Sequence, residues 1–174
     1  MDVSQAIKNR RSIRSFLDKD IEPEKLDLVL EAARLAPSAS NRQEWKFIVV
    51  KDKDKKTKLS AAAFNQGFIG EAAAVIVACA TEAQAVMRCG QPRYTVDLSI
   101  AMSFIMLQAQ ELGLGTCWIG AFDEARVKEI LGVPDDVRVV ALTPLGYPAE
   151  EPAAKPRKSL EDIVCFDAYS QMNM

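Results

Sequence analysis

The segment Tyr94–Leu112 has two apolar stripes when it is drawn as a helix, and this limits the possible folds more than any other feature. The first stripe consists of Tyr94, Leu98, Ala101, Ile105, Ala109 and Leu112, and the second of Val96, Ile100, Phe104 and Leu107. A helix that is apolar over so much of its circumference is buried on more than one side. A chain of 174 residues is expected to fold as one domain, residues 1–174. In a domain of this size, contact with another subunit would cover the second stripe.

Four apolar runs predict β-strands. Two of them, residues 73–80 and 137–142, are continuous, as in strands buried on both faces. The others are residues 47–50 and the shorter run 116–119. Helical patterns lie between these runs.

Three of the helical patterns have clear ends or a clear outer face. Pro23 is well placed as the first residue of a helix, and Pro37 stops that helix. A surface helix is expected from residue 53 to residue 64, with its lysines in solvent. Asp123 caps a later helix, which Gly132 closes.

Charge and residue types exclude several classes of function. The net charge of −2 and the pI near 5.3 argue against general nucleic-acid binding. The sequence contains no histidine, which excludes a Ser-His-Asp triad and any histidine base or metal ligand. No carboxylate cluster has the spacing of a metal site, so no metal is expected. If the protein is an enzyme, a cofactor should carry the difficult chemistry.

The sequence also bears on the cellular compartment. The longest apolar run, Ala72–Ala80, is too short to span a bilayer, so no membrane partner is expected. We expect no secretory signal, because the chain has no apolar segment near its start. The cysteines lack CxxC spacing and are expected to be free, buried thiols in a reducing cytoplasm; a disulfide pair is the alternative. They are Cys79, Cys89, Cys117 and Cys165.

Three arginines and a serine gather in the sequence RRSIRSF near the N-terminus. Arg10 and Arg14 are one helical turn apart if the preceding helix continues, so both could face one target. Guanidinium groups match phosphate oxygens in charge and geometry, and Ser12 adds a hydroxyl donor. Together with Arg11, these residues predict a site for a phosphorylated small molecule. The alternative is a solvated basic face.

The polar sequence PSASNRQEW, residues 37–45, lies between a helix and a strand. In an extended chain, Ala39, Asn41 and Gln43 would project to one side. The two amide side chains offer donors and acceptors, which suit a polyol chain or the edge of a heterocycle. The same residues are equally consistent with an ordinary loop.

Two later segments carry weaker indications. Gly120 allows the backbone to approach a flat group closely, or it simply makes a turn. Regular structure is expected to lapse over residues 146–158, which are rich in Pro, Ala, Glu and Lys. Lys155 and Arg157 alternate there, so an extended chain would aim both to one side. A solvated tail is the alternative.

Taken in order, four motifs resemble the FMN-dependent nitroreductases. They are RRSIRSF, PSASNRQEW, ELGLGTCWIGAF, and GYP followed by KPRKSLEDIV, and they extend nearly from end to end of the chain. The resemblance implies an α+β fold with a mostly antiparallel central sheet flanked by helices, built as an intertwined homodimer. It also implies FMN at two sites in the dimer interface and a C-terminal segment, residues 146–174, that extends toward the partner subunit.

The resemblance further implies FMN contacts, residue by residue. Contacts to the phosphate and ribityl chain are expected from Arg10, Arg11, Ser12 and Arg14, joined from the C-terminal segment by Lys155 and Arg157. Contacts to the ribityl chain and flavin edge are expected, from the partner subunit, through Ser38, Ala39, Asn41 and Gln43. The backbone facing flavin N5 and O4 is expected to be that of Ile119, Gly120 and Ala121.

Two positions depart from the family pattern. Glu44 stands where the family usually has proline before Trp45, and Ala73 replaces a common proline before a buried strand. Neither is an expected FMN contact. Glu44 leaves open the shape of its loop and of the substrate side of the flavin.

The implied function is that of an FMN-dependent NAD(P)H oxidoreductase. NADH or NADPH would reduce FMN, and a nitroaromatic, quinone or similar small-molecule acceptor would take the electrons in a ping-pong reaction. The sequence has no GxGxxG motif, which is compatible with a nicotinamide that binds only transiently over the flavin. One alternative is a same-fold enzyme that dehalogenates a substrate or fragments the flavin. Another is a flavin-binding protein without reductase activity.

Overall fold

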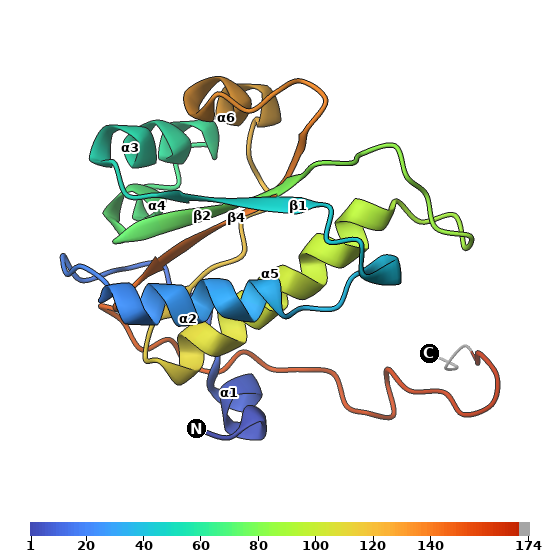
Figure 1. Cartoon of the computed structure of the whole chain (residues 1–174). Helices are drawn as coiled ribbons and strands as arrows, with labels where there is room; N and C mark the ends of the chain where they lie inside the picture. Colours follow the sequence, from blue (N-terminus) through green and yellow to red (C-terminus); the bar gives the residue numbers. More distant parts are fainter. Residues whose placement is uncertain (171–174) are drawn as a thin grey trace.

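A four-stranded sheet forms the centre of residues 1–170, the part of the chain that the computed structural model describes. Its strands, in the order β1-β2-β4-β3, are β1 (Trp45–Val50), β2 (Ala74–Ala80), β4 (Arg138–Gly146) and β3 (Gly115–Thr116). Every neighbouring pair is antiparallel. The expected α+β fold with a mostly antiparallel central sheet is therefore confirmed (Figure 1).

Helices cover both faces of the sheet (Figure 1). One face packs against α2 (Pro23–Arg34) and α5 (Arg93–Glu111), and the other against α3 (Lys53–Ala62), α4 (Phe68–Glu71) and α6 (Glu124–Leu131). The short helix α1 (Val3–Asn9) contacts α5 on the side away from the sheet. The predicted ends of α6 are confirmed, because the Asp123 side chain caps it and Gly132 closes it with a φ of 67°.

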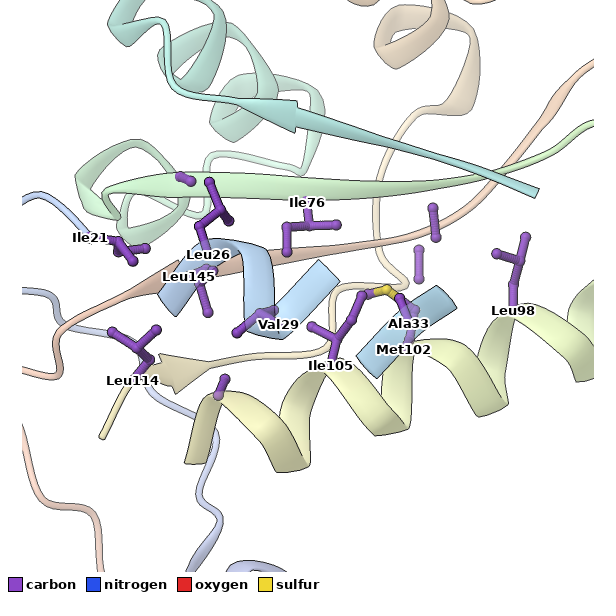
Figure 2. Close-up of a cluster of buried hydrophobic side chains, with 14 of the residues drawn as sticks. Ile21, Leu26, Val29, Ala33, Ile76, Leu98, Met102, Ile105, Leu114 and Leu145 are labelled. Atoms are coloured by element: carbon purple, nitrogen blue, oxygen red, sulfur yellow. The ribbon is translucent and has the colours of Figure 1, made fainter. Parts of the chain in front are cut away.

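Strand β2 is buried on both faces, as its continuous apolar sequence predicts. Ile76 packs toward α2 and α5, whereas Val75 and Val77 pack toward α3, α4 and α6. Successive strand residues point to opposite faces, so both sets must be apolar. Figure 2 shows Ile76 of the sheet in one cluster with Met102 and Ile105 of α5. Burying one such side chain fully contributes about 1.5–3 kcal/mol.

Within the described chain, the two apolar stripes of α5 have different environments. The sheet-facing stripe is buried at Leu98, Ala101, Ile105 and Ala109. On the second stripe, Val96 and Phe104 are 36% and 39% exposed. The single chain therefore covers one of the two sides that the sequence predicts to be buried.

Lys56 of α3 is buried, so the expectation that all lysines of this helix lie in solvent is wrong. Its Nζ donates to the backbone carbonyl of Ala72 and, at 3.4 Å, to that of Ala73. Burial lowers the pKa of Lys56, and the carboxylates of Asp20 and Asp18 oppose that shift. The side chain thus provides a hydrogen-bond donor to the two backbone carbonyls that immediately precede β2.

The segment after α5 also differs in detail from its prediction. The strand expected over residues 116–119 is reduced to the two-residue β3, and the chain rejoins β4 through a single bridge between Ile119 and Leu142. The cysteine prediction is half confirmed. All four thiols are free, but Cys89 and Cys165 are exposed.

The chain loses regular structure beyond β4, as predicted. Residues 149–170 contain neither helix nor strand and run along the lower side of the molecule in Figure 1. They carry exposed apolar side chains at Leu160, Ile163, Val164, Phe166 and Tyr169. Residues 171–174 of the expected C-terminal segment lie outside the described residues. Over residues 1–170, the helices are too short or too polar to cross a membrane.

Candidate functional site

The arginine-rich segment is held as extended chain beside the start of the C-terminal segment. The Ile13 N–H donates to the carbonyl of Thr116 in β3 at 2.9 Å. The Ala149 N–H donates to the Ser15 carbonyl, also at 2.9 Å. The first bond joins residues 103 positions apart (13 and 116), and the second joins residues 134 positions apart (15 and 149).

The extended segment buries its two large apolar side chains and leaves a charged one outside. Ile13 and Phe16 are buried, whereas Arg14 is exposed. The close approach requires Gly115, because a Cβ there would lie 2.7 Å from the Ile13 side chain. The packing of Ile13 and Phe16 therefore fixes the direction in which Arg14 points.

A cavity of about 480 Å³ opens between the arginine-rich segment and the C-terminal segment. We call it the cationic cavity, because its lining includes Lys8, Arg10, Arg11, Arg14, Lys155 and Arg157. Ser12 also lines it, and none of the described residues in its lining is acidic. The structure thus brings together all the residues expected at the phosphate from the two ends of the chain.

The positive charge of the cationic cavity is not balanced by carboxylates within residues 1–170. Arg10, Arg14, Lys155 and Arg157 form no ion pair there. The nearby Glu150 carboxylate accepts a hydrogen bond from the backbone N–H of Arg14 instead of pairing with a guanidinium. Like charges gathered at one place repel, so a bound anion would stabilise this arrangement.

Arg11 differs from the other cations because α1 holds it. Its Nη1 donates to the carbonyl of Lys8 at 2.7 Å and to that of Arg10 at 3.0 Å. These carbonyls belong to the end of α1, where no helical partner is available. Because α1 ends at Asn9, Arg10 and Arg14 do not share a helix face. The extended chain, and not a continued helix, brings them to the same cavity.

Cys117 lies close to the cationic cavity but is not a nucleophile. Burial raises the pKa of its thiol, and the Arg14 guanidinium and the Ser12 hydroxyl oppose that shift. The side chain is 2% exposed. A thiol buried in this way is inert, so Cys117 contributes packing.

Residues 38–43 form a tight turn and not an extended chain, so the backbone has the shape of the loop alternative. The turn contains the 3₁₀ helix η1 (Ala39–Asn41), and Ser40, Asn41 and Gln43 have φ values of 53°, 53° and 54°. Ser38 Oγ accepts from the Gln43 N–H at 3.1 Å. Gln43 Nε2 donates to the Asn41 carbonyl at 3.0 Å and to Asn41 Oδ1 at 3.2 Å. The expected polar residues therefore do lie together, in a different backbone shape.

The backbone of residues 119–121 is partly used by the protein itself. The Ile119 N–H donates to Leu142 at 2.8 Å, and its carbonyl accepts from Leu142 at 3.1 Å. The Ala121 carbonyl accepts from Gln66 Nε2 at 3.3 Å. Within residues 1–170, the N–H groups of Gly120 and Ala121 have no partner. Those two groups can bind a ligand, whereas Ile119 fixes the position of the turn.

The cationic cavity and the turn at residues 38–43 lie at opposite ends of α5. The Ala39 N–H donates to the carboxylate of Asp97, near the start of α5, at 3.1 Å. Thr116, which contacts the arginine-rich segment, follows the other end of that helix. A helix of 19 residues is about 28 Å long. Figure 1 shows the turn, in blue-green, beside the N-terminal end of α5. A single chain therefore does not bring all the expected contacts into one site.

Sequence reasoning left two residues of these groups, Lys8 and Asp97, out of the expected contacts. Lys8 precedes Arg11 by three residues, and this helical spacing could have added it to the cluster. An acidic residue within an apolar helix is a signal for Asp97, because a buried carboxylate needs a partner. The identity of that partner, the Ala39 N–H, depends on the folded chain.

Comparison with known proteins places the chain in a family. The sequence profile of the Nitroreductase family matches residues 7–94 and 61–147. The chain belongs to the nitroreductase family. This nitroreductase-family chain is 31% identical over 185 residues to the FMN reductase [NAD(P)H] of Bacillus subtilis, with 97% of this chain and 74% of the relative covered.

Solved nitroreductase-family structures share the fold. The FMN-dependent nitroreductase of Clostridium difficile superposes with a TM-score of 0.85 at 35% identity, covering 95% of this chain and 99% of that one. The NADPH:FMN oxidoreductase of Vibrio harveyi, solved in complex with NAD⁺, superposes with a TM-score of 0.90 at 29% identity. That match covers 98% of this chain and 79% of the Vibrio chain.

Proposed function

We propose that the protein is an FMN-dependent NAD(P)H oxidoreductase that reduces nitroaromatic, quinone or similar acceptors. The observation that carries the proposal is the cationic cavity, to which both ends of the chain contribute positive side chains without acidic neighbours in the lining. The FMN phosphate is a dianion whose oxygens suit guanidinium and ammonium donors. The names of the FMN reductase and FMN-dependent nitroreductase relatives support the same cofactor.

The residue groups would hold different parts of FMN. The phosphate would meet Arg10, Arg14, Lys155 and Arg157 of the cationic cavity, together with the hydroxyl of Ser12. Arg11, held by the end of α1, would orient this group and contribute its remaining donors. The ribityl chain and flavin edge would meet the turn formed by Ser38, Ala39, Asn41 and Gln43. The N–H groups of Gly120 and Ala121 would meet the ring.

Each complete site would combine two copies of the chain. The cationic cavity and the turn at residues 38–43 are separated by the length of α5, which is longer than FMN. A homodimer can bring the turn of one subunit to the cavity of the other. The uncovered stripe of α5, with Val96 and Phe104, offers the apolar surface for such a contact.

FMN held by these residues would supply two-electron redox chemistry between NADH or NADPH and the acceptor. The protein would bind and orient the cofactor, and the N–H donors of Gly120 and Ala121 would favour negative charge on the ring. The sequence has no histidine, and the thiol of Cys117 is buried. The chain therefore supplies positioning and electrostatics to the reaction.

Comparison of FMN with riboflavin, which lacks the phosphate, tests this proposal. The FMN-free protein should bind about one FMN per subunit and bind riboflavin at least about tenfold more weakly, since charge-assisted phosphate contacts are lost. With FMN bound, it should oxidise NADH or NADPH faster when a nitroaromatic or quinone is added. A protein that stays colourless in excess FMN, or that binds both flavins equally, would contradict the proposal.

A further inference from the structure

Two residues of α5 hold both ends of the turn that precedes β1. The Asp97 carboxylate accepts from the Ala39 N–H at 3.1 Å. The Arg93 guanidinium donates to the Glu44 carboxylate at the far end of the turn. Arg93 and Asp97 are four residues apart, so they lie on the same face of the helix. One rigid helix therefore fixes both the start and the end of residues 39–44.

These contacts are sheltered from solvent. Asp97 is 6% exposed, and the side chains of Arg93 and Glu44 are 15% and 25% exposed. The Glu44 carboxylate also has the Arg42 guanidinium at 3.9 Å, and the Glu44 backbone carbonyl accepts from the Thr81 N–H at 3.1 Å. Salt screens a partly buried ion pair less than an exposed one. Removing Glu44 would leave the more buried charge of Arg93 uncompensated.

The turn between these contacts has a backbone conformation that residues with a Cβ rarely adopt. Ser40, Asn41 and Gln43 all have positive φ. Such conformations persist where surrounding structure imposes them, and they concentrate at ligand-binding sites. Here they bring Gln43 Nε2 and Asn41 Oδ1 to 3.2 Å. The side-chain amides of Asn41 and Gln43 therefore form one ordered polar edge on the turn.

We propose that Glu44, Arg93 and Asp97, which we call the α5 clamp, are positioning residues for the flavin. They hold residues 38–43 in the conformation that binds the ribityl chain and flavin edge, without contacting the cofactor themselves. The inference rests on the proposed function. It gives Glu44 a role that its replacement of the usual family proline left open. Proline would stiffen the turn through its ring, whereas Glu44 does so through a charge pair with Arg93.

A charge exchange tests the α5 clamp. Glu44→Lys and Arg93→Glu each place like charges together, and the double variant restores an opposite pair. Asp97→Asn removes charge at the other end of the turn. Glu31→Lys is the matched control, because Glu31 forms an exposed ion pair with Arg34 on α2 and, within residues 1–170, no ion pair or side-chain hydrogen bond with residues 38–44. Circular dichroism first establishes that each variant is folded.

Three properties are measured on each variant. In FMN-free protein, amide hydrogen exchange of residues 38–44 should accelerate in Glu44→Lys, Arg93→Glu and Asp97→Asn. The same variants should bind FMN about 10- to 100-fold more weakly, the loss typical of a charge-assisted hydrogen bond. The visible absorption band of bound FMN should shift in them. The double variant should recover most of all three effects, and Glu31→Lys should match the wild type.

The outcomes separate the two proposals. Unchanged exchange at residues 38–44 would overturn the clamp. Faster exchange with wild-type FMN affinity and spectrum would overturn the positioning role and leave the proposed function standing. A wild-type protein that binds no FMN would overturn the proposed function and the positioning role with it. If a charge reversal does not fold, Glu44→Gln and Arg93→Gln replace it, with the same expected changes.

Discussion

At the scale of single residues, the cations of the cavity differ in how many of their donors are already bonded to the protein. Arg11 donates to the carbonyls of Lys8 and Arg10, so part of its guanidinium is committed to the end of α1. Arg157 lines the cavity from the C-terminal segment and has no ion-pair partner within residues 1–170. Its charge is therefore available to a bound phosphate.

Arg157→Ala should weaken FMN binding by about 1.5–3 kcal/mol, the contribution of a charge-assisted hydrogen bond. Lys58→Ala is the control, because Lys58 is exposed on α3 and lies outside the cationic cavity. FMN titrations of both FMN-free variants, followed by flavin fluorescence, give the two dissociation constants. Equal constants would remove Arg157 from the site.

The sequence predicts the charge clusters better than it predicts the environment of each charge. The residues from both chain ends that were expected at the phosphate do line one cavity. Lys56 could not be recognised as buried, because its neighbours in α3 include exposed lysines and its partners are backbone carbonyls. Every residue has a backbone carbonyl, so the residue types in the sequence do not indicate which carbonyl accepts a hydrogen bond from a lysine. Lys56 would therefore make a poor control for a solvated lysine.

At the scale of secondary-structure elements, Tyr147 joins the start of α2 to the C-terminal segment. Its O–H donates to the Glu22 carboxylate at 2.5 Å and accepts from Lys25 Nζ at 2.6 Å. Lys19 Nζ lies 3.8 Å from the centre of the ring. The hydrogen bond from Tyr147 is the main reason that the pKa of Glu22 is lowered from 4.5 to about 2.

Tyr147→Phe should lower the thermal unfolding midpoint at neutral pH. A carboxylate whose pKa is lower in the folded state stabilises the fold above its unfolded pKa, near 4.5, and this contribution is lost as pH falls through about 2. The difference between wild type and variant should therefore narrow over that range. Thermal melts at a series of pH values measure it. A constant difference down to pH 2 would assign the effect to contacts other than the Glu22 carboxylate.

Local signals predict the regular elements and fail at the turn before β1. The proline at the start of α2, the cap Asp123 and the closing Gly132 act within a few residues, so their helix ends are readable. The turn at residues 38–43 contains three residues with positive φ and no glycine. Its shape depends on Asp97, which is 58 positions from Ala39. No local propensity encodes that contact.

At the scale of the whole molecule, apolar surface remains uncovered on the described chain. Val96 and Phe104 lie on the outer stripe of α5, and Phe104 also lines an apolar cavity of about 290 Å³ with Val3 and Ala32. The described C-terminal segment adds further exposed apolar side chains, including Phe166 and Tyr169. Exposed apolar surface of this extent favours association.

Phe104→Glu should convert the proposed homodimer into monomers and weaken FMN binding, because a charge would face the apolar partner surface. The monomer should remain folded, since Phe104 lies on the outer side of α5. Ser103→Glu is the control on the same helix, at an exposed position outside the stripe. Sedimentation velocity and FMN titration report the two effects. A wild-type protein that is a fully flavinated monomer would contradict the prediction.

Reductant and acceptor should follow ping-pong kinetics if both use the same exposed face of the flavin in turn. The sequence has no GxGxxG motif that would give the nicotinamide a separate binding region. Initial rates measured over both concentrations should give parallel double-reciprocal lines. Intersecting lines would indicate that the two substrates bind at the same time.

The cationic cavity is built from two segments that lie far apart in the sequence, and this has a consequence for protein synthesis. A ribosome makes Lys155 and Arg157 long after Arg10 and Arg14. Until then, the nascent chain carries only the first group of cations and cannot enclose an anion between the two segments. On the proposed function, FMN would be bound only after both segments have been synthesised.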